Sequence, residues 1–148
     1  WLQLLIYSGR SGNANAVNPL LQLAATRGRL MELLVDRPHE AVQISRELID
    51  QAYMVGILSL MPVLLGIQMS DILEHLPVAA PVVDALGKRS GLLGELLSLV
   101  ELLEDARTDA DRLRMQAILE QFPCIDTGYA NRCLARALTW ANSLAREG

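Results

Sequence analysis

The sequence has few residues of the kinds that carry chemistry. Its 148 residues include two histidines and two cysteines, and only 4% are aromatic. The cysteines, Cys124 and Cys133, lie nine positions apart, which predicts two free thiols in a reducing compartment rather than a disulfide framework. We therefore expect a cytoplasmic protein.

Positive charge is also scarce. No basic run exceeds the pair Lys88-Arg89, and the formal net charge is −4. A nucleic-acid-binding surface requires a basic face, so we expect no nucleic acid partner. The longest apolar stretch, residues 52–67, is broken by Ser59 and Pro62. It is shorter than the roughly 18–20 residues that span a bilayer, so we expect a buried helix and no membrane partner.

Apolar residues are abundant. Hydrophobic residues make up 51% of the chain, and 29 residues are leucine. This composition favours helices over strands, and no segment alternates with period two. We predict an all-α fold, a compact bundle of about seven or eight helices in one domain over residues 1–148. The expected helices cover residues 19–35, 40–65 with a kink at Pro62, 70–76, 81–89, 92–107, 110–122 and 127 onward.

Metal-binding and nucleophilic side chains form no strong constellation. Asp71 and His75 stand at i and i+4 and share a helix face, but a metal site needs three or four ligands. His39 stands alone at a predicted helix start. Ser59 has no histidine near it in the sequence, and a helical serine can bond back to a backbone carbonyl. We expect no catalytic residue, no bound metal and no cofactor.

Acidic residues cluster near the predicted end of one helix. Glu101, Glu104 and Asp105 stand close together and are balanced by nearby arginines. Such charges usually form the solvated face of neighbouring helices, which is the interpretation we adopt. The glycine-containing stretches GLLG and SGRSGN match neither the P-loop nor the dinucleotide-binding pattern.

Two long stretches carry a family resemblance. They are NPLLQLAATRGRLMELL at residues 18–34 and the leucine-rich segment at 52–104, and ALTWANSL at 137–144 fits the same template. Together they resemble the HD-related output domain (HDOD), in the version that follows an EAL domain in bacterial cyclic-di-GMP signalling proteins. The specific part of the pattern is A-aromatic-x-x-G-I/L-L-S-L, followed by L-L-G and I-L-x-x-L-P.

The resemblance implies an all-α fold related to metal-dependent HD phosphohydrolases. In catalytic members, His-Asp follows the counterpart of Gly56-Ile57-Leu58, and these residues help to hold metal ions that activate water. Here the two positions are Ser59 and Leu60, and residues 1–38 contain no histidine. Serine is a poor ligand for divalent metals and leucine is none. The resemblance therefore implies a vestigial HD position without catalysis. Pro62 departs from the pattern, since a helix-compatible residue is expected there.

We expect a non-catalytic regulatory domain, the excised C-terminal part of a larger signalling protein. Its partner would be the covalently linked EAL domain, another signalling protein or a second copy of the chain. The alternative is a residual phosphohydrolase or nucleotide-binding domain, in which Arg27 or Arg29 contacts a phosphate. These two arginines do not share a helix face, so at most one would point inward. A third alternative is a plain helical scaffold that shares only a leucine pattern with the family.

Overall fold

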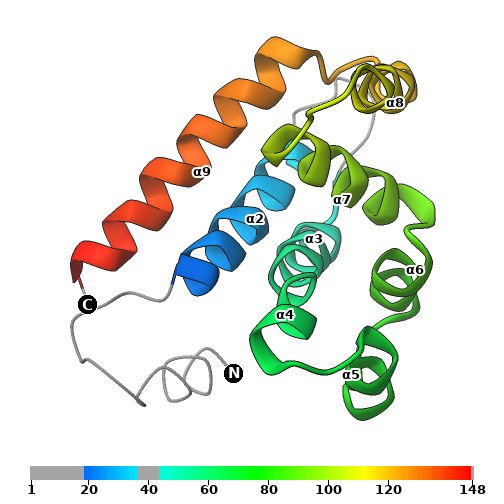
Figure 1. Cartoon of the computed structure of the whole chain (residues 1–148), viewed down its shortest axis with the longest axis vertical. Helices are drawn as coiled ribbons and strands as arrows, with labels where there is room; N and C mark the ends of the chain where they lie inside the picture. The colour runs from blue at the N-terminus through cyan, green and yellow to red at the C-terminus, as the bar shows by residue number, and fades with distance from the viewer. Residues whose placement is uncertain (1–18, 37–43, 148) are drawn as a thin grey trace.

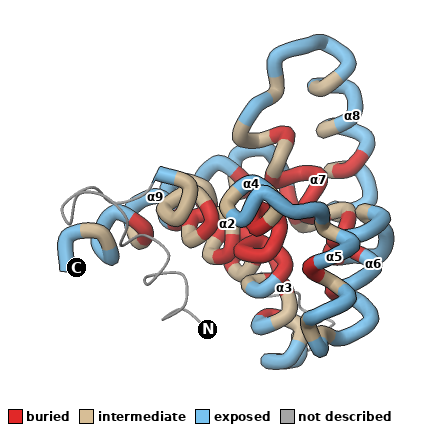
Figure 2. Tube along the Cα trace, turned by 60° about the horizontal axis from the view of Figure 1, so that its bottom comes forward, coloured by how far each residue is buried: buried red, intermediate tan, exposed pale blue. Residues whose placement is uncertain are grey.

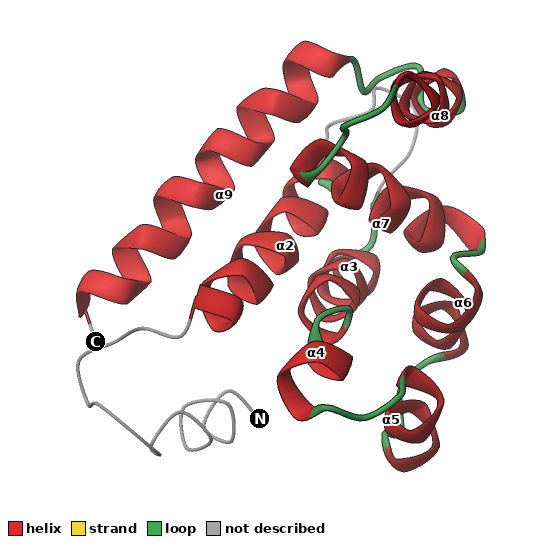
Figure 3. Ribbon diagram, in the orientation of Figure 1, coloured by secondary structure: helices red, strands yellow, loops and turns green. Residues whose placement is uncertain are grey.

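Helices account for all the regular secondary structure in the described part of the chain (Figure 3). The computed structural model describes residues 19–36 and 44–147. Within these ranges there are eight helices and no strand, as the composition predicted. The helices are α2 (Pro19–Val35), α3 (Arg46–Leu58), α4 (Met61–Leu65), α5 (Met69–His75), α6 (Ala80–Lys88), α7 (Gly91–Glu104), α8 (Asp109–Glu120) and α9 (Thr127–Glu147).

Helix α2 lies at the centre of the arrangement. It packs between α3 and the long α9, and α7 crosses near it (Figure 1). Helix α7 in turn contacts α6 on one side and α8 on the other. Proline is favoured in the first turn of a helix because its missing N–H has no partner there, and Pro19 is the first residue of α2, as predicted. The expected cap at Asn18 lies outside the described residues.

The expected helix over residues 40–65 is divided into two. Helix α3 begins at Arg46 because the Ser45 side chain accepts a hydrogen bond from the Leu48 amide, so the predicted helical state of residues 44–45 is wrong. Residues 37–43 lie outside the described part. The predicted interruption at Pro62 is confirmed: α3 ends at Leu58, and Pro62 stands in the first turn of α4.

The apolar segment that includes α3 and α4 is longer than the sequence argument allowed. Residues 46–65 have the length and mean hydropathy, 1.7, that a membrane span requires, and half of their most apolar window is buried inside the fold. A buried core helix passes the same test, so this finding does not contradict the expected buried helix at residues 52–67. In the structure, Ser59 and Leu60 form a turn that separates the two helices.

Other helix boundaries differ by a few residues. The helix expected over residues 70–76 is α5, which begins one residue earlier, at Met69, and ends at His75. Helix α7 ends at Glu104 rather than at residue 107. Thr108 caps α8 by accepting a hydrogen bond from the Asp111 amide, while the Asp111 carboxylate accepts one from the Thr108 amide.

The core lies where α2, α3 and α7 meet (Figure 2). Its largest fully buried side chains include Leu30 and Met31 from α2, Val55 from α3 and Leu97 from α7. Helix α8 contributes little: Ile118 is buried, but Leu113 is 68% exposed, although an apolar side chain on an amphipathic helix is expected to face the core. Helix α9 supplies small residues to the core, because Ala130, Cys133, Ala137 and Ala141 are buried.

Two glycines allow α2 and α3 to approach closely. A Cβ atom at Gly56 would lie 2.6 Å from the Arg27 carbonyl oxygen and from the Gly28 backbone. A Cβ atom at Gly28 would lie 2.9 Å from the Ile57 side chain. Because real Cβ atoms do not come this close to backbone, this crossing requires glycine at position 56. The same contact places Arg27 beside the end of α3.

Candidate functional site

The site centres on Arg27, whose side chain is only 12% exposed. Its Nε lies 3.0 Å from both carboxylate oxygens of Glu104, and its Nη2 lies 2.7 Å from Oε2. Its Nη1 donates a hydrogen bond to Ser59 Oγ at 3.0 Å. One guanidinium therefore joins α2, the end of α3 and the end of α7. We call these three residues, Arg27, Ser59 and Glu104, the arginine triad.

Ser59 is buried and both functions of its hydroxyl are used. It donates to the Gly56 carbonyl at 2.6 Å and accepts from Arg27. The predicted hydrogen bond from this serine to a preceding backbone carbonyl is confirmed, and its acceptor lies three residues earlier in the chain. Leu60 beside it is also buried. The two positions that the family resemblance singled out thus hold a hydroxyl with both hydrogen-bonding functions used and an aliphatic side chain.

The donor set of the triad does not fit a divalent metal. Both oxygens of Glu104 already accept hydrogen bonds from Arg27, and the guanidinium lies against the only oxygen that Ser59 could offer. Within residues 19–36 and 44–147, no group of three or more His, Cys, Asp or Glu side chains could hold a metal ion. His75 Nδ1 forms a hydrogen bond to the Asp71 backbone carbonyl, and His39 lies outside the described residues.

Arg29 lies on a different face of α2, as its spacing from Arg27 predicts. It pairs with Glu32 and lies 5.9 Å from the ring centroid of Trp140 in α9. Tyr53 packs edge-on against the same indole, with the ring centroids 6.4 Å apart. Burial and, to a smaller extent, the Glu32 carboxylate raise the pKa of Tyr53, while Arg29 opposes this shift. The two candidate arginines therefore belong to two separate clusters.

Glu104 is the member of the triad that sequence reasoning missed. It was interpreted as part of a solvated acidic face, but its side chain is 16% exposed and its carboxylate is fully engaged. That interpretation holds for Asp105, whose side chain is 62% exposed, and is wrong for Glu104. No local signal distinguishes the two residues, because the partner of Glu104 lies 77 positions away in the sequence.

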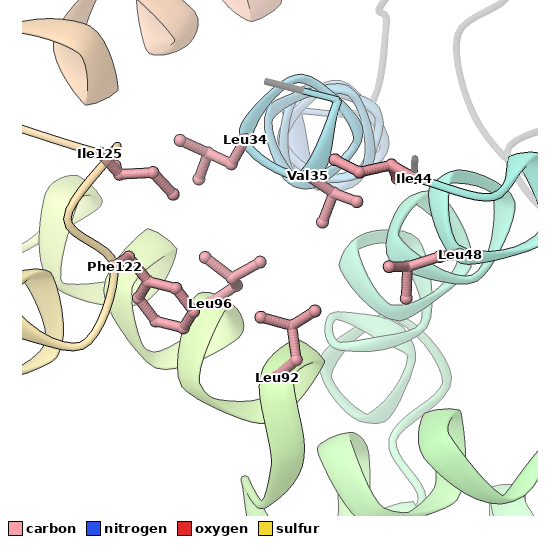
Figure 4. Close-up of a pocket in the computed structure, with 8 residues that line it drawn as sticks. All are labelled: Leu34, Val35, Ile44, Leu48, Leu92, Leu96, Phe122 and Ile125. Atoms are coloured by element: carbon pink, nitrogen blue, oxygen red, sulfur yellow. The ribbon is translucent and has the colours of Figure 1, made fainter. Parts of the chain in front are cut away.

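An apolar pocket opens at the C-terminal end of α2 (Figure 4). Its volume is about 240 Å³, and every side chain that lines it is apolar. Leu34 and Val35 come from α2, and Leu92 and Leu96 from α7; the others are Ile44, Leu48, Phe122 and Ile125. The pocket offers no acid, base or nucleophile from the described residues.

Both cysteines are free in the structure. Cys133 is a buried core residue of α9, and Cys124 is half-buried. No ion pair or hydrogen bond that would activate either thiol is present among the described residues.

Comparison with known proteins gives one relative. Over 87 residues, which make up 59% of this chain, the sequence is 34% identical to the cyclic di-GMP phosphodiesterase CdgJ of Vibrio cholerae. The aligned part spans only 19% of the length of that protein. No protein-family model matches the chain, and no solved structure is significantly similar to it. The similarity supports a place for this chain among proteins of cyclic di-GMP signalling.

Proposed function

We propose that this chain is a non-catalytic regulatory domain of the HDOD type, which acts in bacterial cyclic di-GMP signalling. It would respond through protein contacts or a sensed ligand, and its immediate partner would be an EAL domain in the same protein. The observation that carries this proposal is the arginine triad. By the family resemblance, Ser59 stands where catalytic HD proteins carry a metal ligand, and the Arg27 guanidinium donates a hydrogen bond to its hydroxyl.

Electrostatics explains why this arrangement opposes metal-dependent hydrolysis. A divalent ion at the Ser59 hydroxyl would lie next to the Arg27 guanidinium that is hydrogen-bonded to it, and both Glu104 oxygens are already engaged by the same guanidinium. Arg27 is held in place by Glu104. If Arg27 moved away, the largely buried Glu104 carboxylate would lose its counter-ion. The triad therefore replaces an ion-binding function with a structural one.

The relative supports the biological setting of the proposal. CdgJ is a cyclic di-GMP phosphodiesterase, and the aligned segment is about a fifth of its length. A segment of that size suits one domain of a larger protein. We propose that the phosphodiesterase activity belongs to another part of the protein and that the present segment adjusts it.

The alternative function, a residual phosphohydrolase or nucleotide-binding domain, has less support. It relies on Arg27 or Arg29 to contact a phosphate, yet each already has a carboxylate partner. A nucleotide would have to displace Glu104 or Glu32. Alanine substitution of both arginines tests this alternative, and nucleotide binding that survives in a folded double variant contradicts it.

The regulatory role is tested with the parent protein. The cyclic di-GMP hydrolysis rate of the intact parent is compared with that of a version that lacks this domain, and the separate 148-residue chain is then added back. We expect deletion to change the rate, and we expect the added chain to bind and to shift the rate back. Equal rates for the two versions, with no binding of the chain measured by calorimetry, would contradict the proposal.

A further inference from the structure

A second cavity lies where α6, α7 and α8 meet, and none of the three residues of the arginine triad lines it. Helix α7 runs between the other two helices there (Figure 1). The cavity has a volume of about 290 Å³ and is lined by Arg89, Ser98, Glu101, Leu102 and Arg114. Four of these five side chains are polar or charged, in contrast to the apolar pocket at the end of α2.

Ser98 is the first sign that this cavity receives a ligand. Three polar side chains are buried within the described residues, namely Thr26, Ser59 and Ser98. The first two hydroxyls donate hydrogen bonds to backbone carbonyls. Ser98 is only 7% exposed, and its hydroxyl has no hydrogen-bond partner among the described residues. Because buried polar groups are nearly always paired, this hydroxyl calls for a partner from outside the chain.

Arg89 is the second sign, because it ends α6 as a left-handed cap and its guanidinium is held beside the cavity. It is the only described non-glycine residue with a positive φ, at 53°. Its Nε donates to Glu101 Oε1 at 2.9 Å, and its Nη1 donates to the Leu86 carbonyl at 2.8 Å. Gly94 abuts its backbone so closely that a Cβ there would lie 2.3 Å from the Arg89 carbonyl carbon. The guanidinium is thereby fixed, while its Nη2 has no partner among the described residues.

Arg114 is the third sign. It forms no ion pair with the described residues, whereas Arg112 in the same helix pairs with Asp109. Its charge lowers the pKa of Asp111 slightly, as the smallest of several causes that begin with hydrogen bonds from Thr108. The cavity wall thus carries two guanidinium groups and one carboxylate, Glu101, which Arg89 already neutralises. Among the residues that line the cavity, the Arg114 guanidinium therefore has no acidic partner.

We infer that this cavity binds an oxyanion, such as the phosphate group of a small ligand. The Ser98 hydroxyl, the Arg89 Nη2 and the Arg114 guanidinium would donate hydrogen bonds to its oxygens, and the positive charge of Arg114 balances it. Guanidinium groups suit this role because their planar donors match the geometry of phosphate oxygens. The inference does not depend on the proposed regulatory function.

The test titrates inorganic phosphate and, separately, cyclic di-GMP into the 148-residue chain by calorimetry in phosphate-free buffer. We expect saturable binding of at least one of them. Arg114→Gln should weaken that binding about tenfold or more, because a charge-assisted contact is lost. Arg112→Gln is the matched control: it removes the same charge two residues away, outside the cavity, and should leave the affinity nearly unchanged.

Ser98→Ala supplies a readout that a merely structural serine would not give. Without ligand, this variant should melt at a temperature equal to or higher than that of the wild type, because an unpaired buried hydroxyl is removed. With phosphate, its melting temperature should rise less than that of the wild type. Circular dichroism establishes that each variant is folded.

The outcomes separate the sources of the anion. If cyclic di-GMP binds no more tightly than inorganic phosphate, the site is assigned to free phosphate. If cyclic di-GMP binds more tightly, the site is assigned to a phosphodiester ligand. Absence of saturable binding of both at millimolar concentration, or equal weakening by Arg112→Gln and Arg114→Gln, overturns the inference. In that case water alone would satisfy Ser98.

Discussion

Arg27 and Glu104 stand 77 residues apart in the sequence and form a two-pronged ion pair, with the Arg27 Nη2 2.7 Å from the Glu104 Oε2. The pair fixes the end of α7 against the middle of α2. Since the same guanidinium also bonds Ser59, a single side chain sets the relative positions of three helices. The geometry around Ser59 therefore depends on this pair.

Removal of Glu104 should be costly. Glu104→Gln leaves the Arg27 charge largely buried without its counter-ion, and breaking a buried pair in this way costs about 3 kcal/mol of unfolding free energy. The matched control is Asp50→Asn, which breaks the exposed i,i+4 pair with Arg46 and should cost under about 0.5 kcal/mol. Urea denaturation of both variants measures the difference. Similar small losses in both would show that the triad contributes little to stability.

The tight crossing of α2 and α3 gives a second prediction. Gly56→Ala would place a methyl group 2.6 Å from the Gly28 and Arg27 backbones, and overpacking of this kind costs about 1–3 kcal/mol. Gly87→Ala is the control, because its new Cβ would meet only the Leu73 side chain at 3.7 Å. It should be neutral or stabilising by about 0.5 kcal/mol, since alanine favours helix over glycine. Thermal unfolding measures the stability of the two variants. A Gly56→Ala variant as stable as the wild type would contradict the close crossing of α2 and α3.

Tyr53 should make the fold sensitive to alkali. Burial raises its pKa above the ordinary value of 10.0, so its neutral form is favoured in the folded state. The folded chain then holds its phenolic proton longer than the unfolded chain does. Stability from this group is fully present below pH 10 and is lost as the pH rises through the raised pKa. Tyr53→Phe should lose less stability than the wild type between pH 9 and 11 in chemical denaturation. Parallel pH profiles would count against this account.

Asp111 should make the start of α8 sensitive to acid. Hydrogen bonds from Thr108 lower the pKa of its carboxyl group, so the ionised form is favoured in the folded state. Its contribution to stability is present above the ordinary pKa and is lost as the pH falls through the lowered value. Asp111→Ala should therefore be less stable than the wild type at pH 7, and the two should converge in strong acid. The control is Asp109→Ala, which removes a neighbouring carboxylate that pairs only with the exposed Arg112. A gap between wild type and Asp111→Ala that stays constant with pH would contradict the prediction.

The helical fold could be predicted because its signals are local. Pro19, Pro62 and Thr108 act on backbone groups within a few residues, so the starts of α2, α4 and α8 follow from the sequence. Boundaries that depend on distant packing were less accurate. Leu113 has an apolar side chain on a helix, yet it is exposed because α8 packs mainly through Ile118 and the neighbouring α7.

The candidate site could be predicted only in part. The spacing of Arg27 and Arg29 placed them on different faces of α2, and the motif around Gly56 drew attention to Ser59. The sequence does not indicate that Glu104 is the partner of Arg27, because a contact across 77 residues depends on how α7 crosses α2. For the same reason, Ser98 and Arg114 did not stand out: burial and the lack of a partner are properties of the folded chain.

We propose that this chain does not hydrolyse cyclic di-GMP. The hydrolysis rate of the purified chain with added manganese, together with its metal content by elemental analysis, tests this proposal. We expect no bound metal and no turnover above the rate in buffer. Stoichiometric metal with turnover that chelation abolishes would contradict it, because residues other than the arginine triad would then have to form a metal site.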